Sequence, residues 1–312
     1  MAETICGVDL SSEVLDVRLG RRGKPERFDR SAAGIEAFAG FCKARGVTLV
    51  VMEATGGYER LPYVLLWQLG IPVAIVNPRA VRQFAEAMGV LEKTDIIDAG
   101  IIAWFAEVKH IVGQEPLGER HALLEALVTR LRQVTDLKTA QANQRRLVTE
   151  QAVLMVIDEL TALLQRQIRS LETQIAALID QDPLWSKLDQ AFRELKGVAD
   201  RTVARIMADL PEIGTISNKA VAKLAGTAPI ARDSGKTKGK RPIRGGRASV
   251  RSILYVVGDL VRRYDPDFAA FYERLSKAGK PKKVIRIALA RKLLVRLNAK
   301  ARDVRREIAL AA

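Results

Sequence analysis

Four carboxylates stand where an α/β protein can gather them at one edge. Asp9 ends the first predicted strand, Glu53 ends the central strand, and Asp95 and Asp98 lie three residues apart on one face of a predicted helix. Strand ends and a nearby helix can converge on one point, so these oxygens could hold hard divalent cations that clamp a phosphodiester. Taken singly, each acid is a surface acid or a helix cap, and Lys93-Thr94-Asp95 resembles a helix start.

A serine in a basic loop is the second candidate for chemistry. Ser234 lies in the segment 226–249, which is rich in Gly, Lys, Arg, Ser and Pro. The cations around it suit a phosphate site, and they are Arg232, Lys236, Lys238, Lys240, Arg241, Arg244 and Arg247. Ser-Gly in a basic loop is common, however, and most such serines are structural.

The N-terminal elements that must position the acids form an α/β pattern. Alternating or β-branched apolar runs predict strands over 4–10, 14–20, 26–30, 47–54 and 72–77. Helices are predicted over 32–45 after Ser31, over 59–69, from Asn77-Pro78 onward, and over 95–109 after Thr94. The order β-β-β-α-β-α-β-α indicates a mixed sheet whose first three strands form a meander.

The middle of the chain is helical. Between Gly118 and Gly197 there is no glycine, and Pro183 is the only proline. Apolar residues recur there in steps of three and four, a heptad pattern broken at Glu150 and Thr161, namely Leu147, Leu154, Ile157, Leu164, Ile168, Leu171, Ile175 and Leu178. This predicts a coiled coil, with a pair of core helices inside one globule as the alternative.

The last part is predicted to be mainly α-helical. Leu195-Lys196-Gly197-Val198-Ala199, followed by an apolar helix, indicates a helix–hairpin–helix, although a plain helix–turn–helix connection gives the same pattern. Further helices are predicted over 249–263 and 282–308. We therefore expect three parts, an α/β domain over 1–112, a helical coiled-coil segment over 113–188, and a basic domain over 189–312.

The charge distribution favours nucleic acid as the partner. The chain of 312 residues carries a net charge of +15, and residues 193–312 alone hold 29 basic and 11 acidic residues. Such a concentrated positive field attracts polyanions, whereas a solvated basic surface is the weaker explanation. Arg291 and Lys292, in the last predicted helix, are further candidates for nucleic-acid contact.

Composition excludes several other classes. Two cysteines and two histidines argue against a disulfide framework and a histidine-based zinc enzyme. The uncharged stretch 61–78 contains Pro62, Gly70 and Pro72, so it is predicted to be a helix, a turn and a strand, not a membrane span. We expect a cytoplasmic, nucleoid-associated bacterial protein.

In combination, these motifs resemble a known family. Gly7-Val8-Asp9, Met52-Glu53-Ala54-Thr55-Gly56, Asn77-Pro78 and Lys93-Thr94-Asp95-Ile96-Ile97-Asp98-Ala99 look like the RuvC-like DEDD domain of the insertion-sequence-110 type transposases. Those enzymes are relatives of the Piv-type DNA invertases and are also called bridge-RNA-guided recombinases. The last third is similar to the family's second domain at Gly226, Pro229, Ser234-Gly235, Arg244-Gly245, Leu254, Tyr272, Gly279-Lys280 and Arg291-Lys292-Leu293-Leu294. Thr227-Ala228 departs from the usual leucine after the glycine.

The resemblance implies a RuvC/RNase H-like fold and a mechanism. One or two Mg²⁺ ions, with Mn²⁺ as a substitute, would be bound by Asp9, Glu53, Asp95 and Asp98. Ser234 would be the nucleophile that forms a phosphoserine ester with DNA. The partners implied are donor and target DNA, a guide RNA encoded beside the gene, and other copies of the chain in a tetramer built from dimers.

Two other functions stay open on the residues alone. A RuvC-like nuclease that uses metal and water to cut DNA junctions would need the four acids and not Ser234. A non-catalytic nucleic-acid-binding protein would need neither. Substitution of the acids and of Ser234 separates the three.

Overall fold

The computed structural model describes residues 4–90, 95–231, 233–234, 237–239 and 241–311, and of 95–97, 234, 237 and 238 it describes the backbone alone. The chain divides into two compact units, residues 1–117 and 118–312, each taken by itself below. The middle helices share a hydrophobic core with the C-terminal helices. The three-part division with a boundary at 188 stays a prediction. No described helix is both long enough and apolar enough to span a bilayer.

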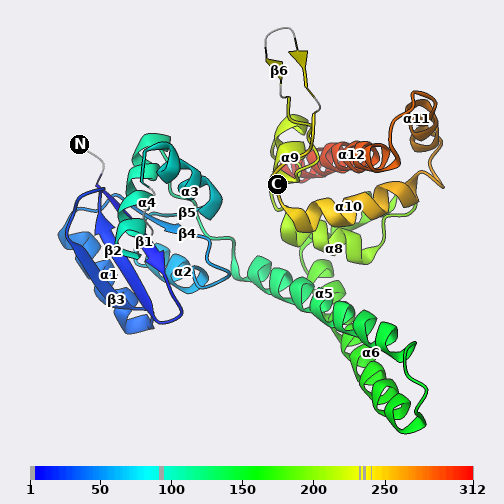
Figure 1. The fold of residues 1–312 in the computed structure, drawn as a ribbon, viewed down its shortest axis with the longest axis horizontal. Coiled ribbons are helices and arrows are strands. Elements are labelled where there is room, and N and C mark those ends of the chain that lie inside the picture. Colours follow the sequence, from blue (N-terminus) through cyan, green and yellow to red (C-terminus); the bar gives the residue numbers. More distant parts are fainter. Residues whose placement is uncertain (1–3, 91–94, 232, 235–236, 240, 312) are drawn as a thin grey trace. The chain divides into compact units, whose positions relative to one another are not determined.

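The first unit is a five-stranded mixed sheet with helices on both faces (Figure 1). The strands are β1 (Ile5–Leu10), β2 (Val14–Leu19), β3 (Pro25–Asp29), β4 (Leu49–Glu53) and β5 (Val73–Val76), in the order β3-β2-β1-β4-β5. β1 pairs antiparallel with β2 and parallel with β4, and β4 pairs parallel with β5. The predicted α/β domain with a mixed sheet is confirmed.

The helices of this unit begin where the sequence predicts. They are α1 (Ala32–Ala44), α2 (Arg60–Gln68), α3 (Pro78–Ala87) and α4 (Asp95–Lys109). Ser31 Oγ accepts a hydrogen bond from the Gly34 N–H at 3.2 Å, and Asn77 Oδ1 accepts one from the Arg79 N–H at 2.9 Å, which caps α1 and α3. Thr94, the predicted cap of α4, lies outside the described residues.

Alternation along β1 divides its side chains between the two faces of the sheet. Cys6, Val8 and Leu10 pack in the cluster that also contains Phe38 of α1. Ile5 packs on the opposite face, in the cluster that contains Ala103 and Phe105 of α4. Period-two alternation therefore assigns Gly7 and Asp9 to the α4 face.

The second unit is mainly helical, as predicted. Its helices are α5 (Glu119–Arg145), α6 (Gln151–Asp180), α7 (Pro183–Arg193), α8 (Asp200–Asp209), α9 (Asn218–Leu224), α10 (Ala248–Val261), α11 (Pro266–Lys277) and α12 (Lys282–Ala311). Between α9 and α10 the short strands β6 (Asp233–Ser234) and β7 (Thr237–Lys238) pair antiparallel.

All but the first of the predicted heptad residues lie on α6, which forms an antiparallel hairpin with α5 within one chain (Figure 1). Ile157, Leu164, Ile168 and Leu171 of α6 are buried, as are Leu124, Val128, Leu131 and Val134 of α5. Arg145 of α5 donates to Asp158 of α6 at 2.6 and 3.0 Å, which joins the two helices near their connection. Much of the predicted apolar seam is thus used inside the chain, as the alternative interpretation expected.

Candidate functional site

The sheet register carries Asp9 and Glu53 to the same edge. Val8 of β1 lies beside Met52 of β4, and both strands run in the same direction. One residue further along each strand comes Asp9 on β1 and Glu53 on β4. Leu49 and Val51 of β4 pack in the α4-face cluster, so alternation assigns Glu53 to that face together with Asp9. The two carboxylates thus stand at neighbouring strand ends on one face of the sheet.

Helix α4 brings a third acid against these strands. An ideal Cβ at Gly7 would lie 2.0 Å from the Ala99 carbonyl oxygen and 2.6 Å from the Ala103 nitrogen. The backbones of β1 and α4 therefore touch at a point that a side chain would block. Asp98 is half-buried and directly precedes Ala99. Asp95 lies in the first turn of the same helix, with its backbone alone described.

The donor set fits a hard cation by its chemistry. Carboxylate oxygens are the ligands that Mg²⁺ prefers, and two strand ends and one helix supply them here. Within the described residues, which leave out the Asp95 side chain, no three metal-ligating groups form a complete cluster. Asp9, Glu53 and Asp98 each have an interaction partner.

The loop after Glu53 is fixed by a carboxylate of its own. Glu59 Oε2 accepts hydrogen bonds from the Thr55 and Gly57 N–H groups at 3.0 and 2.9 Å, and Thr55 Oγ1 donates to the Glu53 carbonyl oxygen at 3.2 Å. These bonds hold the chain in a turn directly after the strand. The backbone of Glu53 is therefore anchored on both sides, which favours a fixed position for its side chain.

Asp16 is a fifth acid at this face that sequence reasoning missed. It is directly opposite Asp9 in the β1–β2 ladder and 8% exposed. Arg27 of β3 donates to both its carboxylate oxygens, at 2.7 and 3.1 Å. The signal in the sequence was an aspartate between the apolar residues Leu15 and Val17 of a predicted strand. Because Arg27 neutralises Asp16, we assign this acid a structural role.

Ser234 lies in the β6–β7 hairpin, paired with Thr237. The preceding residue, Asp233, is joined to Arg241 at 2.8 Å, and a bridge between Pro229 and Ile243 closes the loop below the hairpin. The structure describes the backbone of Ser234, and its side chain lies outside the description. The predicted basic loop thus contains a short ladder, and the backbone of Ser234 lies on one of its strands.

The base of this loop is a glycine contact. An ideal Cβ at Gly246 would lie 2.2 Å from the Gly226 nitrogen, and Gly226 and Gly246 have φ values of 67° and 72°. Both positions combine a left-handed backbone with close approach, which glycine alone accommodates without strain. The two ends of the segment that carries Ser234 are therefore held together.

The predicted cations of this loop differ in their surroundings. Arg232, Lys236 and Lys240 lie outside the described residues, and so does the side chain of Lys238. Arg244 is exposed to solvent. Arg247 donates to Glu212 at 2.5 and 2.6 Å and to the Asp209 carbonyl oxygen at 3.1 Å. Arg247 therefore ties the start of α10 to the turn after α8.

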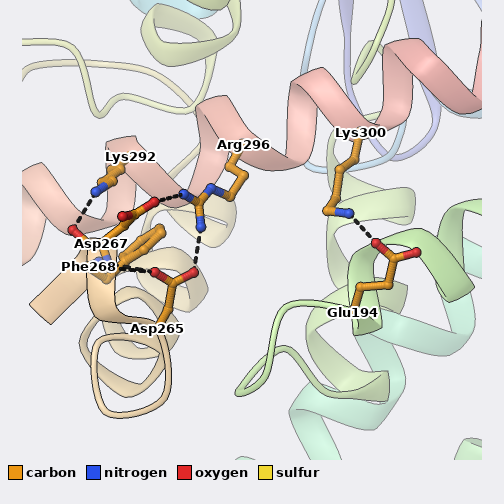
Figure 2. A network of polar contacts seen from close by, with 7 residues as sticks. All are labelled: Glu194, Asp265, Asp267, Phe268, Lys292, Arg296 and Lys300. Atoms are coloured by element: carbon orange, nitrogen blue, oxygen red, sulfur yellow. Dashed lines mark hydrogen bonds and ion pairs between the residues drawn. The ribbon is translucent and has the colours of Figure 1, made fainter.

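Arg291 and Lys292 lie on α12, where it faces α11. Lys292 Nζ donates to the Asp267 carbonyl oxygen at 2.6 Å, as Figure 2 shows, and lies 4.8 Å from the centre of the Phe268 ring. Arg296, one turn further on, is bonded to Asp265 at 2.5 Å and to Asp267 at 2.9 Å. Lys292 and Arg296 thus brace the start of α11 against α12.

The connection between α7 and α8 contains the predicted glycine turn. Gly197 has a φ of 101° and packs against the backbone of Val261 in α10. The first turn of α8 follows Ala199, which provides no side-chain cap. Whether this turn binds a phosphate as a helix–hairpin–helix does stays a prediction.

Comparison with known proteins gives consistent results over most of the chain. Residues 6–153 match the model of a transposase family with a DEDD domain, and residues 189–273 match the model described as "Transposase IS116/IS110/IS902 family". The chain is 28% identical over 261 residues to the pilin gene-inverting proteins of Moraxella lacunata and Moraxella bovis, covering 78% of this chain and 77% of each of those proteins. A Thermus thermophilus RuvC structure aligns with 35% of this chain and 98% of its own chain, at 16% identity and a TM-score of 0.28, a likeness too weak to assign a fold.

Proposed function

Because the chain belongs to the IS110 family of transposases, a family of enzymes that act on DNA, we propose that it recombines DNA through a phosphoserine link at Ser234. In this proposal the N-terminal unit is a RuvC-like domain whose acids bind divalent metal. A guide RNA supplies the sequence specificity, and the active assembly is a tetramer built from two dimers.

The observation that carries the proposal is the backbone contact between Gly7 and Ala99. The contact holds α4 against the strand that ends in Asp9. In this proposal Asp98 points toward the sheet edge shared by Asp9 and Glu53. The missing side chain at Gly7 is what allows this close approach beside the strand ends that carry acids. Bringing acids together without a cation would cost free energy by mutual repulsion.

Asp9, Glu53, Asp95 and Asp98 are the residues that would hold Mg²⁺. When bound, the metal neutralises charge on the scissile phosphate and lowers the barrier to attack at phosphorus. The four carboxylates contribute hard anionic oxygens, and the Glu59 turn keeps Glu53 from moving away. Mn²⁺ has similar ligand preferences and is expected to substitute.

Ser234 supplies the covalent step. Its Oγ forms a bond to phosphorus while the bridging P–O bond of the DNA strand breaks. The hydroxyl proton leaves Ser234, and the departing deoxyribose oxygen gains a proton. The phosphodiester energy is kept in the serine ester, so a second strand end can attack it and restore DNA without ATP. The short hairpin presents Ser234 on a strand that is held at its base by Gly226 and Gly246.

The proposed partners follow from charge and from exposed apolar surface. The excess of 29 basic over 11 acidic residues in 193–312 suits DNA and a guide RNA held by backbone contacts. On α6, Val153, Val156, Leu160 and Leu163 are exposed at steps of three and four. This second apolar stripe, distinct from the one buried against α5, is the face we propose for dimerisation.

Trapping of a covalent adduct tests the function. The protein is incubated with Mg²⁺, 5′- or 3′-labelled DNA carrying the element's ends, and RNA transcribed from the flanking sequence, and then run on a denaturing gel. Ser234→Ala and Ser252→Ala, a serine of α10, are run alongside. A labelled band at the mass of the protein in the parent and in Ser252→Ala, absent from Ser234→Ala, is expected.

Other outcomes of this experiment would contradict individual parts of the proposed function. Equal cleavage by parent and Ser234→Ala, with no attached DNA, would identify a RuvC-like nuclease that uses water. Adduct formation without RNA would remove the guide. Binding to DNA that is unaffected by either serine or acid substitution, with no cleavage in any sample, would leave a binding protein only.

A further inference from the structure

A groove between α11 and α12 has a lining that differs from the other described hollows of the second unit. It is open to solvent, has a volume of about 580 Å³, and is lined by Phe271 and Arg274 of α11 and by Ala288, Arg291, Lys292 and Val295 of α12. Three of these side chains are cationic, three are apolar and none is acidic. The hollows beside α6 and beside α7, by contrast, are lined by several acids.

The wall of the groove is fixed by the network in Figure 2. Lys292 Nζ lies 4.8 Å from the centre of the Phe268 ring and 5.0 Å from that of Phe271, and donates to the Asp267 carbonyl oxygen. Burial beside these rings lowers the pKa of Lys292, against the opposing effect of Asp267. The neighbouring carboxylates of Asp265 and Asp267 are bonded to Arg296. Both of these carboxylates are therefore paired with Arg296 and not with an arginine that lines the groove.

The guanidinium groups of Arg274 and Arg291 are available to contact a ligand in the groove. Arg274 Cζ lies 5.2 Å from the centre of the Phe271 ring, so its planar group is already placed against an aromatic. Within the described part of the chain, no carboxylate forms an ion pair with Arg274 or Arg291. A cation that lacks an internal partner and borders an apolar floor is suited to a phosphate whose attached group enters the groove.

The apolar side chains of the groove indicate which chemical group is attached to that phosphate. Phe271, Ala288 and Val295 form a surface on which a nucleobase can lie. A base inside a duplex has both faces covered by its neighbours. The groove therefore suits unpaired nucleotides.

We propose that the α11–α12 groove binds an unpaired segment of RNA, with its bases against Phe271 and its phosphates at Arg274 and Arg291. RNA is favoured over DNA because a folded RNA keeps loops and bulges permanently unpaired, whereas donor and target DNA are duplexes outside the moment of exchange. The inference rests on the guide RNA of the proposed function and gives it a docking site.

Affinity and location are measured separately. Fluorescence anisotropy follows a labelled 12-mer of uridine binding to the full-length parent, Phe271→Leu and the double variant Arg274→Gln/Arg291→Gln. Arg306→Gln, an exposed arginine of α12 away from the groove, is the matched control. Thermal unfolding of each variant checks that α11 and α12 stay packed. The flanking RNA carrying 4-thiouridine, and separately the DNA carrying 4-thiothymidine, are then photocrosslinked and the peptides mapped.

Phe271→Leu is expected to weaken 12-mer binding at least about fivefold, the low end for a lost base–aromatic stack. The double arginine variant is expected to flatten the slope of log affinity against log salt by about 1.4, for two phosphate contacts to a single strand. Arg306→Gln should match the parent, and RNA crosslinks should fall within α11 and α12.

Unchanged affinity in folded groove variants, or crosslinks to this groove from DNA alone, would overturn the proposal. A parent that binds no RNA at all would overturn it together with the guide. The serine adduct measured above with DNA reports on the recombination chemistry independently, so the two failures are distinguishable.

Discussion

Gly7 of β1 and Ala99 of α4 are in backbone contact, because a Cβ on Gly7 would lie 2.0 Å from the Ala99 carbonyl oxygen. The contact fixes the helix that carries Asp98 against the strand that carries Asp9. Neither carboxylate takes part in it. The position of α4 against the sheet face that carries Asp9 and Glu53 is therefore set by Gly7, a residue that has no side chain.

Gly7→Ala is expected to destabilise the N-terminal unit and to abolish DNA cleavage. The added methyl meets backbone atoms of Ala99 and Ala103, which cannot rotate away, so β1 and α4 must separate. Overpacking of this kind costs about 1–3 kcal/mol or more. Thermal unfolding and the cleavage gel measure the two effects.

Gly40→Ala is the matched control for that substitution. Gly40 lies in α1, is exposed, and has no atom within 4 Å of an added Cβ. Alanine is a better helix former than glycine by about 1 kcal/mol, so this variant should unfold at a slightly higher temperature and cleave normally. A Gly7→Ala protein as stable and active as Gly40→Ala would show that α4 need not touch β1.

Asp98→Asn should abolish strand cleavage and leave RNA binding largely intact. The substitution keeps the size of the side chain and removes the charge that would bind metal. Loss of one group that stabilises charge in an active site costs about 10²–10³-fold in rate. Glu107→Gln removes an exposed acid from the same helix and should cleave like the parent. Normal cleavage by Asp98→Asn would refute the metal assignment.

The strands and helix caps of the N-terminal unit could be predicted because they depend on local sequence. Alternation gives β1 and β2, and Ser31 and Asn77 cap the helices that their positions indicate. Helix α11 lies between the helices predicted over 249–263 and 282–308 and was not predicted, although Asp265 and Pro266 form its cap and first helical residue.

Register and packing between distant segments could not be predicted. In the sequence Asp16 is an isolated acid. Only the pairing of β2 with β3 shows that Arg27 lies beside it. In the sequence Gly7 is only a small residue in a strand. Only the structure shows that α4 packs directly against it. The heptad spacing of Leu164 and Leu171 is the same for a partner in another chain and for α5 in this one.

Substitutions of two adjacent leucines of α6 separate an effect on folding from an effect on assembly. Leu164 is 9% exposed and packs in the α5–α6 core, whereas Leu163 is 44% exposed on the stripe proposed for dimerisation. Leu164→Glu should unfold the hairpin, because it buries a charge without a partner. Leu163→Glu should keep the helical content and thermal stability of the parent and lower the mass measured by light scattering. An unchanged mass for Leu163→Glu would place the interface between copies elsewhere.

Lowering the pH should weaken the ion pair between Glu212, in the turn after α8, and Arg247, at the start of α10. Burial opposes ionisation of Glu212, but the hydrogen bonds and charge of Arg247 outweigh burial and lower its pKa below the ordinary 4.5. A carboxylate whose pKa is depressed in the folded state stabilises the fold above its unfolded pKa. That contribution is lost as the pH falls from about 4.5 through the lower folded value.

Glu212→Gln should therefore lower the unfolding temperature at pH 6 and make little difference at the most acidic pH where the parent still folds. The expected loss is about 1–3 kcal/mol at pH 6, the range for a half-buried cation left without its partner. Glu307→Gln, an exposed acid of α12, should follow the parent at every pH. If Glu212→Gln and the parent differ equally at both ends of the pH range, the effect comes from packing and the ion pair with Arg247 contributes nothing.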